Sequence, residues 1–316
     1  MTVTPAPAVP SGPPTARLGG RAGRTREQLP AGVSRTAGYW FVALYVGLLL
    51  LLGVAPAAYA IYLAFAANTN GGFASAFHVA FTDYRFWPAF GHVLEFMAIW
   101  LVSQTLLVVV LVLVLHSMAQ RVGAIFRFLF YIPGALAGAA SVIVWLFMLD
   151  PTASPFAFVL HWFGYAAFNN TIAPANLPAI FAVMAFWTGA GGWIVVMYGA
   201  LNNIPHELLE AANMDGSSAL QTALRIKLPL IRKWVVYMLV LSFAGGTQLF
   251  TEPTVLAPAA QGIGISKFWS PNQLAWFVAS EYNQYNEAAA ISVVLLVLGL
   301  VIAGLLVWRG RLFEVE

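Results

Sequence analysis

The chain has 316 residues, of which 60% are hydrophobic and only 9% are charged. A soluble globular domain carries about 25% charged residues, so the composition excludes an ordinary soluble protein. The net charge of +3 does not indicate a nucleic-acid partner, because the basic residues lie at the ends of apolar runs. There are no cysteines, which excludes disulfides, thiolate metal sites and cysteine nucleophiles.

Residues 1–37 form a basic tail that is rich in proline, alanine and glycine and has almost no apolar side chains to bury. We expect this tail to be disordered and cytoplasmic. A membrane domain follows over residues 38–312, and residues 313–316 form a short C-terminal tail.

Runs of roughly 20 apolar residues are long enough to cross a bilayer as helices. Such runs occupy about residues 39–65, 93–116, 128–148, 178–201, 234–256 and 288–308. The pattern predicts an all-α, polytopic membrane protein with six transmembrane helices. Glycines cluster in the third and fourth runs, where small residues let helices approach closely or leave room between them.

The lysines and arginines define the sidedness of the chain. Of the 15, all except Arg85 and Lys267 lie in the N-terminal tail, in alternate connections or after the last run. Because basic residues favour the cytoplasmic side, we expect both termini and the connection 203–231 in the cytoplasm. Aromatic residues of the outer loops, such as Trp269, are expected to anchor the interface, and a minority to face a substrate or partner.

The polar connection 204–231 is predicted to form two short helices around a turn. Pro205 suits the first turn of the first helix, and Gly216 allows the backbone geometry of the turn. Either Asp215 or Ser217 can cap the second helix. The residues alone leave two interpretations open, which are a loop that docks on another protein and an amphipathic loop that rests on the lipid surface.

The spacing within this connection resembles the E-A-A loop of permease subunits of bacterial type I ABC importers. It has Glu210-Ala211-Ala212, then Gly216 four residues later, and Ile-Lys-Leu-Pro at 226–229, which begins ten residues after the glycine. The run Asp-Tyr-Arg-Phe-Trp at 83–87 further resembles the carbohydrate-uptake, maltose-type branch. The resemblance covers roughly residues 40–312.

The resemblance implies that the loop forms a coupling helix, which sits in a groove of a cytoplasmic ABC ATPase dimer. It also implies an extracytoplasmic substrate-binding protein and a second homologous permease subunit, in a heterodimer held in membrane lipid. The residues expected to contact the ATPase are Glu207, Glu210, Ala211, Ala212, Asp215 and Gly216.

No nucleotide site is visible in the sequence. A P-loop needs Gly-Lys-Ser/Thr, and none of Lys227, Lys233 and Lys267, the only lysines, follows a glycine. We therefore expect no catalytic residue and no cofactor in this chain, with ATP and magnesium bound at the partner ATPase. The histidines show no ligand spacing, so no metal site is predicted.

Polar groups inside a membrane are costly and tend to be functional, although helix packing is the alternative role for each of them. Polar residues on spans four and five, together with positions that the resemblance places in the maltose-type cavity, are candidates for the substrate pathway. These are Gly134, Gly138, Thr188, Gly189, Gly192, Trp193, Ser242, Gly246, Thr247 and Gln248. The glycines indicate either a roomier cavity or no retained sugar site.

The implied function is to form half of the pathway of an ATP-driven importer in the bacterial cytoplasmic membrane. The expected substrate is a sugar, either an oligosaccharide or a disaccharide. A polyol, an amino sugar or a glycerol-phosphate ester is the alternative within the same machinery. An integral-membrane transferase and a scaffold without transport are distant alternatives, because the acidic residues are dispersed and form no pair at one membrane face.

Overall fold

Regular structure in the described part of the chain is entirely helical. The computed structural model describes residues 35–66, 72–136, 138–260 and 264–309. No strand is present in these ranges, so the predicted all-α fold is confirmed. The predicted N-terminal tail lies outside the described residues except for 35–37, which are already helical, and the tail 313–316 lies wholly outside them.

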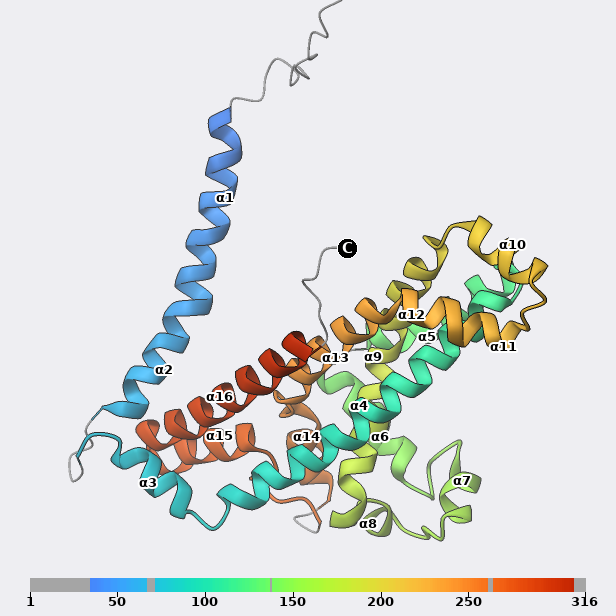
Figure 1. Ribbon diagram of the computed structural model, residues 1–316. Helices are drawn as coiled ribbons and strands as arrows, with labels where there is room; N and C mark the ends of the chain where they lie inside the picture. The colour runs from blue at the N-terminus through green and yellow to red at the C-terminus, as the bar shows by residue number, and fades with distance from the viewer. Residues whose placement is uncertain (1–34, 67–71, 137, 261–263, 310–316) are drawn as a thin grey trace, which may run out of the picture. The chain divides into compact units, whose positions relative to one another are not determined.

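The chain divides into two compact units, Met1–Val54 and Ala55–Glu316. The described part of the first unit holds α1 (Arg35–Leu49) and the π-helix η1 (Leu50–Val54) (Figure 1). In chain order the second unit contains α2 (Ala55–Phe65), α3 (Ser75–Thr82), α4 (Phe86–Ser117), α5 (Gln120–Ala135), α6 (Ala139–Leu149), α7 (Ala157–Trp162), α8 (Phe168–Thr171), η2 (Pro174–Asn176), α9 (Leu177–Asn202), α10 (His206–Met214), α11 (Ala219–Thr222), η3 (Ala223–Lys227), α12 (Leu228–Leu230), α13 (Arg232–Gly246), α14 (Thr251–Ala259), α15 (Pro271–Tyr282) and α16 (Tyr285–Arg309).

The helices that are long and apolar enough to cross a membrane are Val42–Phe65, Phe86–Ser117, Pro174–Asn202 and Tyr285–Arg309. Two bent pairs raise the number from 4 to 6 if each pair is one span. These pairs are Gln120–Ala135 with Ala139–Leu149, bent by 104°, and Ala219–Leu230 with Arg232–Gly246, bent by 64°. The first bend lies within the predicted third span, which the apolar runs did not predict, whereas the second lies at Ile231, before the predicted fifth span begins.

The predicted fifth span is interrupted between α13 and α14, and side-chain hydrogen bonds from a distant segment support this break. The carbonyl oxygen of Thr247 accepts a hydrogen bond from the Asn272 amide at 3.0 Å, and that of Leu249 accepts one from the Ser270 hydroxyl at 2.7 Å. An unpaired carbonyl in an apolar medium costs several kcal/mol. The two side chains supply the partners that a continuous helix would have supplied.

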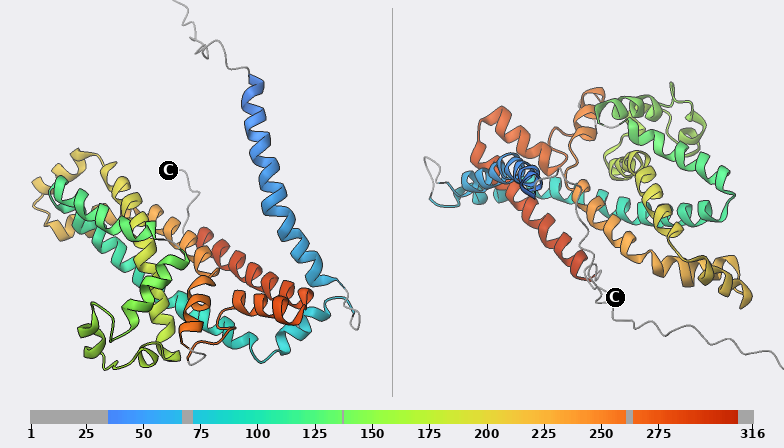
Figure 2. Two further views of the ribbon diagram at one scale, coloured as in Figure 1. Left: turned by 180° about the vertical axis from the view of Figure 1, so that it is seen from behind. Right: turned by 90° about the horizontal axis from the view of Figure 1, so that it is seen from above.

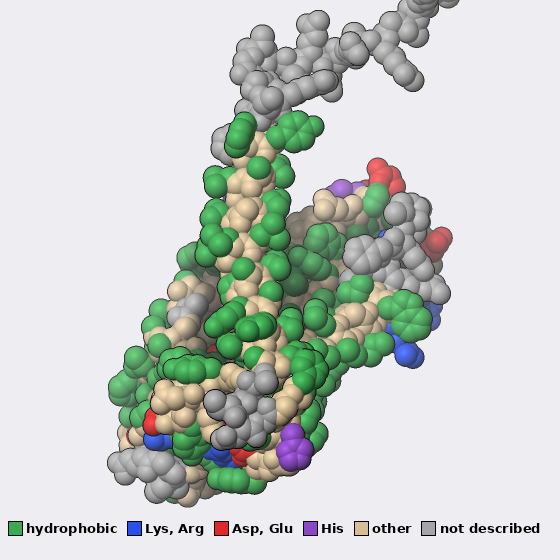
Figure 3. Space-filling view, turned by 90° about the vertical axis from the view of Figure 1, so that its left-hand side faces the viewer, with side chains coloured by type: hydrophobic (Ala, Val, Ile, Leu, Met, Phe, Trp, Pro, Cys, Tyr) green, Lys and Arg blue, Asp and Glu red, His purple; other side chains and the backbone are tan. Residues whose placement is uncertain are grey.

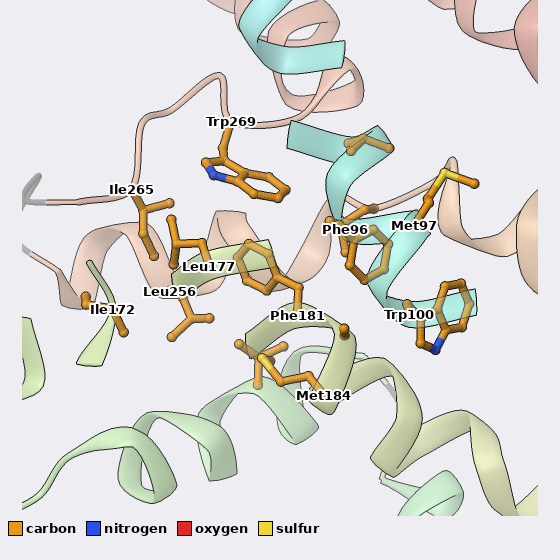
Figure 4. Packing of buried hydrophobic residues seen from close by; sticks show 14 of the residues in the cluster. Phe96, Met97, Trp100, Ile172, Leu177, Phe181, Met184, Leu256, Ile265 and Trp269 are labelled. Carbon is orange, nitrogen blue, oxygen red and sulfur yellow. The ribbon is translucent and has the colours of Figure 1, made fainter. Parts of the chain in front are cut away.

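Three buried clusters hold the second unit together. One joins α4, α6, α9, α13 and α14 around Phe181 and Trp269, whose ring centroids are 4.8 Å apart (Figure 4). Another joins α2, α3, α15 and α16 with the start of α4. The third packs the later halves of α4 and α9 against α13, Ile204 and Ile231, at the base of the connection 204–231.

The connections of the second unit separate into two groups. The short helices α3, α7 and α8 lie toward one end of this unit, and α10, α11 and α12 lie toward the other (Figures 1 and 2). This separation matches the grouping of loops that the lysine and arginine positions predicted. Hydrophobic side chains dominate the face drawn in Figure 3, as expected for helices that lie in lipid.

A close contact between α5 and α9 involves Gly191 of α9. A Cβ atom at this position would lie 2.1 Å from the carbonyl oxygen of Phe130 in α5, which is far inside van der Waals contact. Glycine thus lets the two backbones meet, as small residues do in membrane helix pairs.

We predict that Gly191→Ala destabilises the protein by about 1–3 kcal/mol, the usual effect of overpacking. Thermal unfolding of the full chain in mild detergent measures the change. Gly199→Ala is the matched control, because a Cβ at Gly199 of the same helix meets no atom within 4 Å. Equal melting temperatures for the two variants would contradict the prediction, because they would show that the α5–α9 contact relaxes without loss of stability.

Candidate functional site

The connection between α9 and α13 folds as helical segments around a turn, as the sequence predicted. The first segment, α10, begins at His206, so Pro205 precedes the helix and does not occupy its first turn. Gly216 lies in the turn with φ +76°, a conformation that favours glycine. The Ser217 amide donates to the Ala212 carbonyl at 3.0 Å, which closes the end of α10.

The second segment is capped by Ser218, so the predicted caps Asp215 and Ser217 are wrong. The Ser218 hydroxyl accepts from the Gln221 amide at 3.3 Å, and the Gln221 side chain accepts from the Ser218 amide at 2.9 Å. This reciprocal pair is a capping box. Asp215, Ser217 and Ser218 are all residue types that can cap a helix. Ser218 is the cap because α11 begins at Ala219, directly after it.

The tip of this loop is exposed, whereas its base is buried. Of the six residues predicted to contact an ATPase, Ala212 is buried, and the exposed ones are Glu207, Glu210, Ala211, Asp215 and Gly216. None of the three carboxylates has a hydrogen-bond or ion-pair partner among the described residues. Met214 is 87% exposed and Leu220 is 68% exposed, so apolar side chains lie beside the free acids.

The predicted pathway residues of span four lie against α4 and α5. A Cβ at Gly134 would lie 3.0 Å from the Thr188 carbonyl oxygen, so these two positions adjoin. The Thr188 hydroxyl donates to the Met184 carbonyl at 3.2 Å, within its own helix. A Cβ at Gly189 would lie 3.7 Å from the side-chain oxygen of Gln104.

Gln104 and Trp100 of α4 were missed by the sequence analysis, and they contact the predicted residues of span five. The Gln104 amide donates to the Ser242 hydroxyl at 2.7 Å, and Gln104 is only 1% exposed. The ring of Trp100 covers Gly246, where a Cβ would lie 2.8 Å from it. The sequence signal that could have identified Gln104 is a glutamine within the apolar run 93–116, where polar side chains are costly. The space at Gly246 is filled, so this glycine does not create a roomier cavity.

The remaining predicted pathway residues do not join this group. A Cβ at Gly138 or Gly192 would meet no atom within 4 Å. Trp193 packs edge-on against Tyr237 with ring centroids 6.0 Å apart. The Thr247 hydroxyl donates to the Ala244 carbonyl at 2.8 Å, and the exposed side chain of Gln248 has no hydrogen-bond partner among the described residues.

A cavity of about 560 Å3 lies elsewhere, between α6, α7 and α9. It is lined mainly by apolar and aromatic side chains, including Trp145, Phe163 and Trp187, and by none of the predicted pathway residues. A sugar needs many hydrogen-bonding partners, so this cavity does not have the lining of a sugar site.

Trp269 is buried at 2% exposure, so its predicted role as an interfacial anchor is wrong. Its ring stacks on His92 with centroids 5.0 Å apart, and the His92 Nδ1 atom lies 3.1 Å from the Trp269 carbonyl oxygen. Loop position could not reveal this, because His92 lies far away in the sequence.

A family model for the inner membrane component of binding-protein-dependent transport systems matches residues 119–313, more than half of the chain. The chain belongs to this family. It is therefore an inner-membrane transport component, and the predicted ABC importer permease is confirmed. The match begins just before α5 and includes the whole coupling loop.

The permease is similar to several named transport permeases. The arabinooligosaccharides transport system permease protein AraP of Bacillus subtilis is 26% identical over 231 residues, 72% of each chain. The sn-glycerol-3-phosphate transport system permease protein UgpA of Salmonella typhimurium is 27% identical over 221 residues, covering 67% of this chain and 74% of UgpA. The diacetylchitobiose uptake system permease protein NgcF of Streptomyces coelicolor is 27% identical over 196 residues, covering 61% and 55%.

The fold also matches a solved structure. A chain in the crystal structure of a bacterial alginate ABC transporter, in complex with an alginate pentasaccharide-bound periplasmic protein, has a TM-score of 0.74 at 19% identity. The match covers 89% of the permease and 96% of that chain. At this identity the likeness supports the fold.

An ion pair fixes the turn between α3 and α4. The Arg85 Nε atom lies 2.9 and 3.0 Å from the two carboxylate oxygens of Asp83. The guanidinium also lies against aromatic rings, with its carbon 5.4 Å from the ring centroids of Phe277 and Tyr282. Hydrogen bonds from Arg85 hold the pKa of the Asp83 carboxyl below its usual 3.8, and hydrogen bonding to Asp83 raises the pKa of Arg85.

We predict that Asp83→Asn lowers the melting temperature at neutral pH, because it removes a charge-assisted pair worth about 1.5–3 kcal/mol. The folded-state pKa of Asp83 is lowered, so this stabilisation is complete above the usual value and is lost as the pH falls through the lowered one. Thermal unfolding across pH should therefore show the gap between wild type and variant closing in acid.

The control for this prediction is Asp150→Asn, another outer-loop carboxylate, whose hydrogen bonds are to Thr152 two residues away. A gap for Asp83→Asn that stays constant down to about pH 3 would contradict the assignment.

Proposed function

We propose that the permease forms half of the membrane pathway of an ATP-driven sugar importer and that residues 204–231 couple it to a cytoplasmic ATPase. The observation that carries the coupling is the contrast between the base and the tip of this loop. Ile204 and Ile231 are buried at 8% and 1% exposure, which fixes the base in the helix bundle. Glu210 and Met214 at the tip are exposed together, which suits a protein partner better than a lipid surface.

The chain needs an external source of energy, because the sequence has no Gly-Lys-Ser/Thr run. ATP and magnesium bind at the partner ATPase dimer, and the permease itself catalyses no reaction and holds no cofactor or metal. ATP-driven closure of that dimer favours one of two permease states, which gives alternating access. Glu210 is the main polar contact, and Gly216 sets the turn that presents it.

A second, non-identical permease subunit completes the pathway, and an extracytoplasmic binding protein delivers the substrate. The family description supports the class of the delivering partner. Both termini and the coupling loop face the cytoplasm, because the basic residues favour that side. Membrane lipid surrounds the paired subunits.

A sugar of two or more units is the substrate that the similarities favour. AraP and NgcF are named for arabinooligosaccharide transport and diacetylchitobiose uptake, whereas UgpA is named for sn-glycerol-3-phosphate transport. The six predicted spans carry no lysine or arginine. Neutral hydrogen-bonding groups suit a hydroxyl-rich sugar better than a phosphate ester. A polyol or an amino sugar is the next alternative.

We predict that Glu210→Lys weakens binding of the ATPase by at least about 30-fold, the effect of losing a hot-spot contact of about 2 kcal/mol or more. Co-purification and ATP-driven uptake measure the loss. Glu281→Lys is the matched charge reversal, because Glu281 is exposed on α15, outside the coupling loop. Normal ATPase recovery with Glu210→Lys would refute the proposed coupling.

We further predict that membrane vesicles containing the assembled importer accumulate labelled arabino- or chito-oligosaccharides in an ATP-dependent manner and do not accumulate glycerol 3-phosphate. The physical reason is that the six predicted spans carry no lysine or arginine to neutralise a phosphate ester. Vesicles with Glu210→Lys provide the uncoupled background. Uptake of glycerol 3-phosphate in place of the sugars would move the assignment to the phosphate-ester alternative.

A further inference from the structure

Four side chains from four elements gather beside the coupling loop and form what we call the basic cluster: His116 of α4, Arg127 of α5, Tyr198 of α9 and Lys227 of η3. The guanidinium carbon of Arg127 lies 3.6 Å from the centroid of the Tyr198 ring. The His116 ring lies 5.6 Å from the same ring, and its Nδ1 atom lies 3.0 Å from the Lys227 ammonium. None of these residues has a place in the proposed substrate pathway.

The basic cluster presents hydrogen-bond donors and no carboxylate. An ammonium group can only donate, so the His116 Nδ1 atom accepts from Lys227 and the ring proton lies on Nε2 as a further donor. The Nη1 atom of Arg127 is buried without a hydrogen-bond partner. Within the described residues, no acid pairs with Arg127 or Lys227. Two basic groups therefore lie in one cluster, linked through Tyr198 and His116, without a countercharge from the described residues.

Three members of the basic cluster lie near helix ends, and the ends of membrane-spanning helices commonly reach the headgroup region of a bilayer. His116 lies one residue before the end of α4, Tyr198 four residues before the end of α9, and Arg127 seven residues after the start of α5. At 1.5 Å per residue, all three lie within about 10 Å of a helix end. The four side chains are half-buried, so each remains partly accessible.

We propose that the basic cluster binds the phosphate group of an anionic phospholipid. A phosphate oxyanion has only acceptor atoms, which complements a group of donors, and basic pockets between membrane helices are suited to lipid headgroups. Lys227 belongs to the coupling loop, so the bound headgroup ties this loop to α4, α5 and α9. The site does not depend on the proposed function, because it requires neither an ATPase nor a transported substrate.

Native mass spectrometry of the full chain with phosphatidylglycerol or phosphatidylcholine tests the site. Arg127→Gln and Lys227→Gln should each reduce retention of phosphatidylglycerol about fivefold, which corresponds to about 1 kcal/mol per charge. Retention of phosphatidylcholine should not change. The matched control is Arg121→Gln, an exposed arginine on the same helix as Arg127, and it should keep the wild-type preference.

Two further measurements separate the outcomes. Arg127→Lys keeps the charge and should still retain phosphatidylglycerol. This variant separates a loss of lipid binding from a loss of the packing of Arg127 on Tyr198. If Arg127→Gln fails to fold, Lys227→Gln still tests the site. Thermal unfolding with millimolar inorganic phosphate should show no stabilisation that depends on the basic cluster. Equal lipid retention in Arg121→Gln and Lys227→Gln, or cluster-dependent stabilisation by phosphate without lipid preference, would overturn the lipid assignment.

Discussion

Hydrogen bonding of the backbone in an apolar solvent is the constraint on which this structure depends. Every spanning segment is helical because lipid offers no partner for a free amide or carbonyl. The break between α13 and α14 is permitted only because Ser270 and Asn272 reach back to the carbonyls of Leu249 and Thr247. The segment before α15 is thus part of the membrane domain, and the buried stack of Trp269 on His92 holds it in place.

Small residues act in two different ways within this bundle. Gly191 removes a side chain so that the backbones of α5 and α9 can meet. Gly246 leaves space that the ring of Trp100 then fills, so a glycine on a pathway helix does not by itself widen the pathway. Beside this ring, Gln104 donates to Ser242 and links the second and fifth spans through a buried polar contact.

The connection 204–231 combines a buried base with an exposed tip whose carboxylates have no partner among the described residues, which is the contrast behind the proposed coupling role. Buried Ile204 and Ile231 connect the base to the core formed by α4, α9 and α13. The contact of Lys227 with His116 adds a polar link from the same loop to α4. A lipid phosphate bound there, as proposed, would stabilise this link without touching the exposed carboxylates that are proposed to contact an ATPase.

The sequence by itself determined the helical membrane class, the grouping of the loops and, through the spacing of Glu210, Gly216 and the 226–229 run, the family. These features are local, because hydrophobic length, charge position and motif spacing are read along the chain. Only the tertiary structure decided that spans three and five are broken, that Trp269 is buried and that Gln104 meets Ser242. Each of these depends on contacts between distant segments, and an apolar run carries no information about which partner will fill a gap or satisfy a carbonyl.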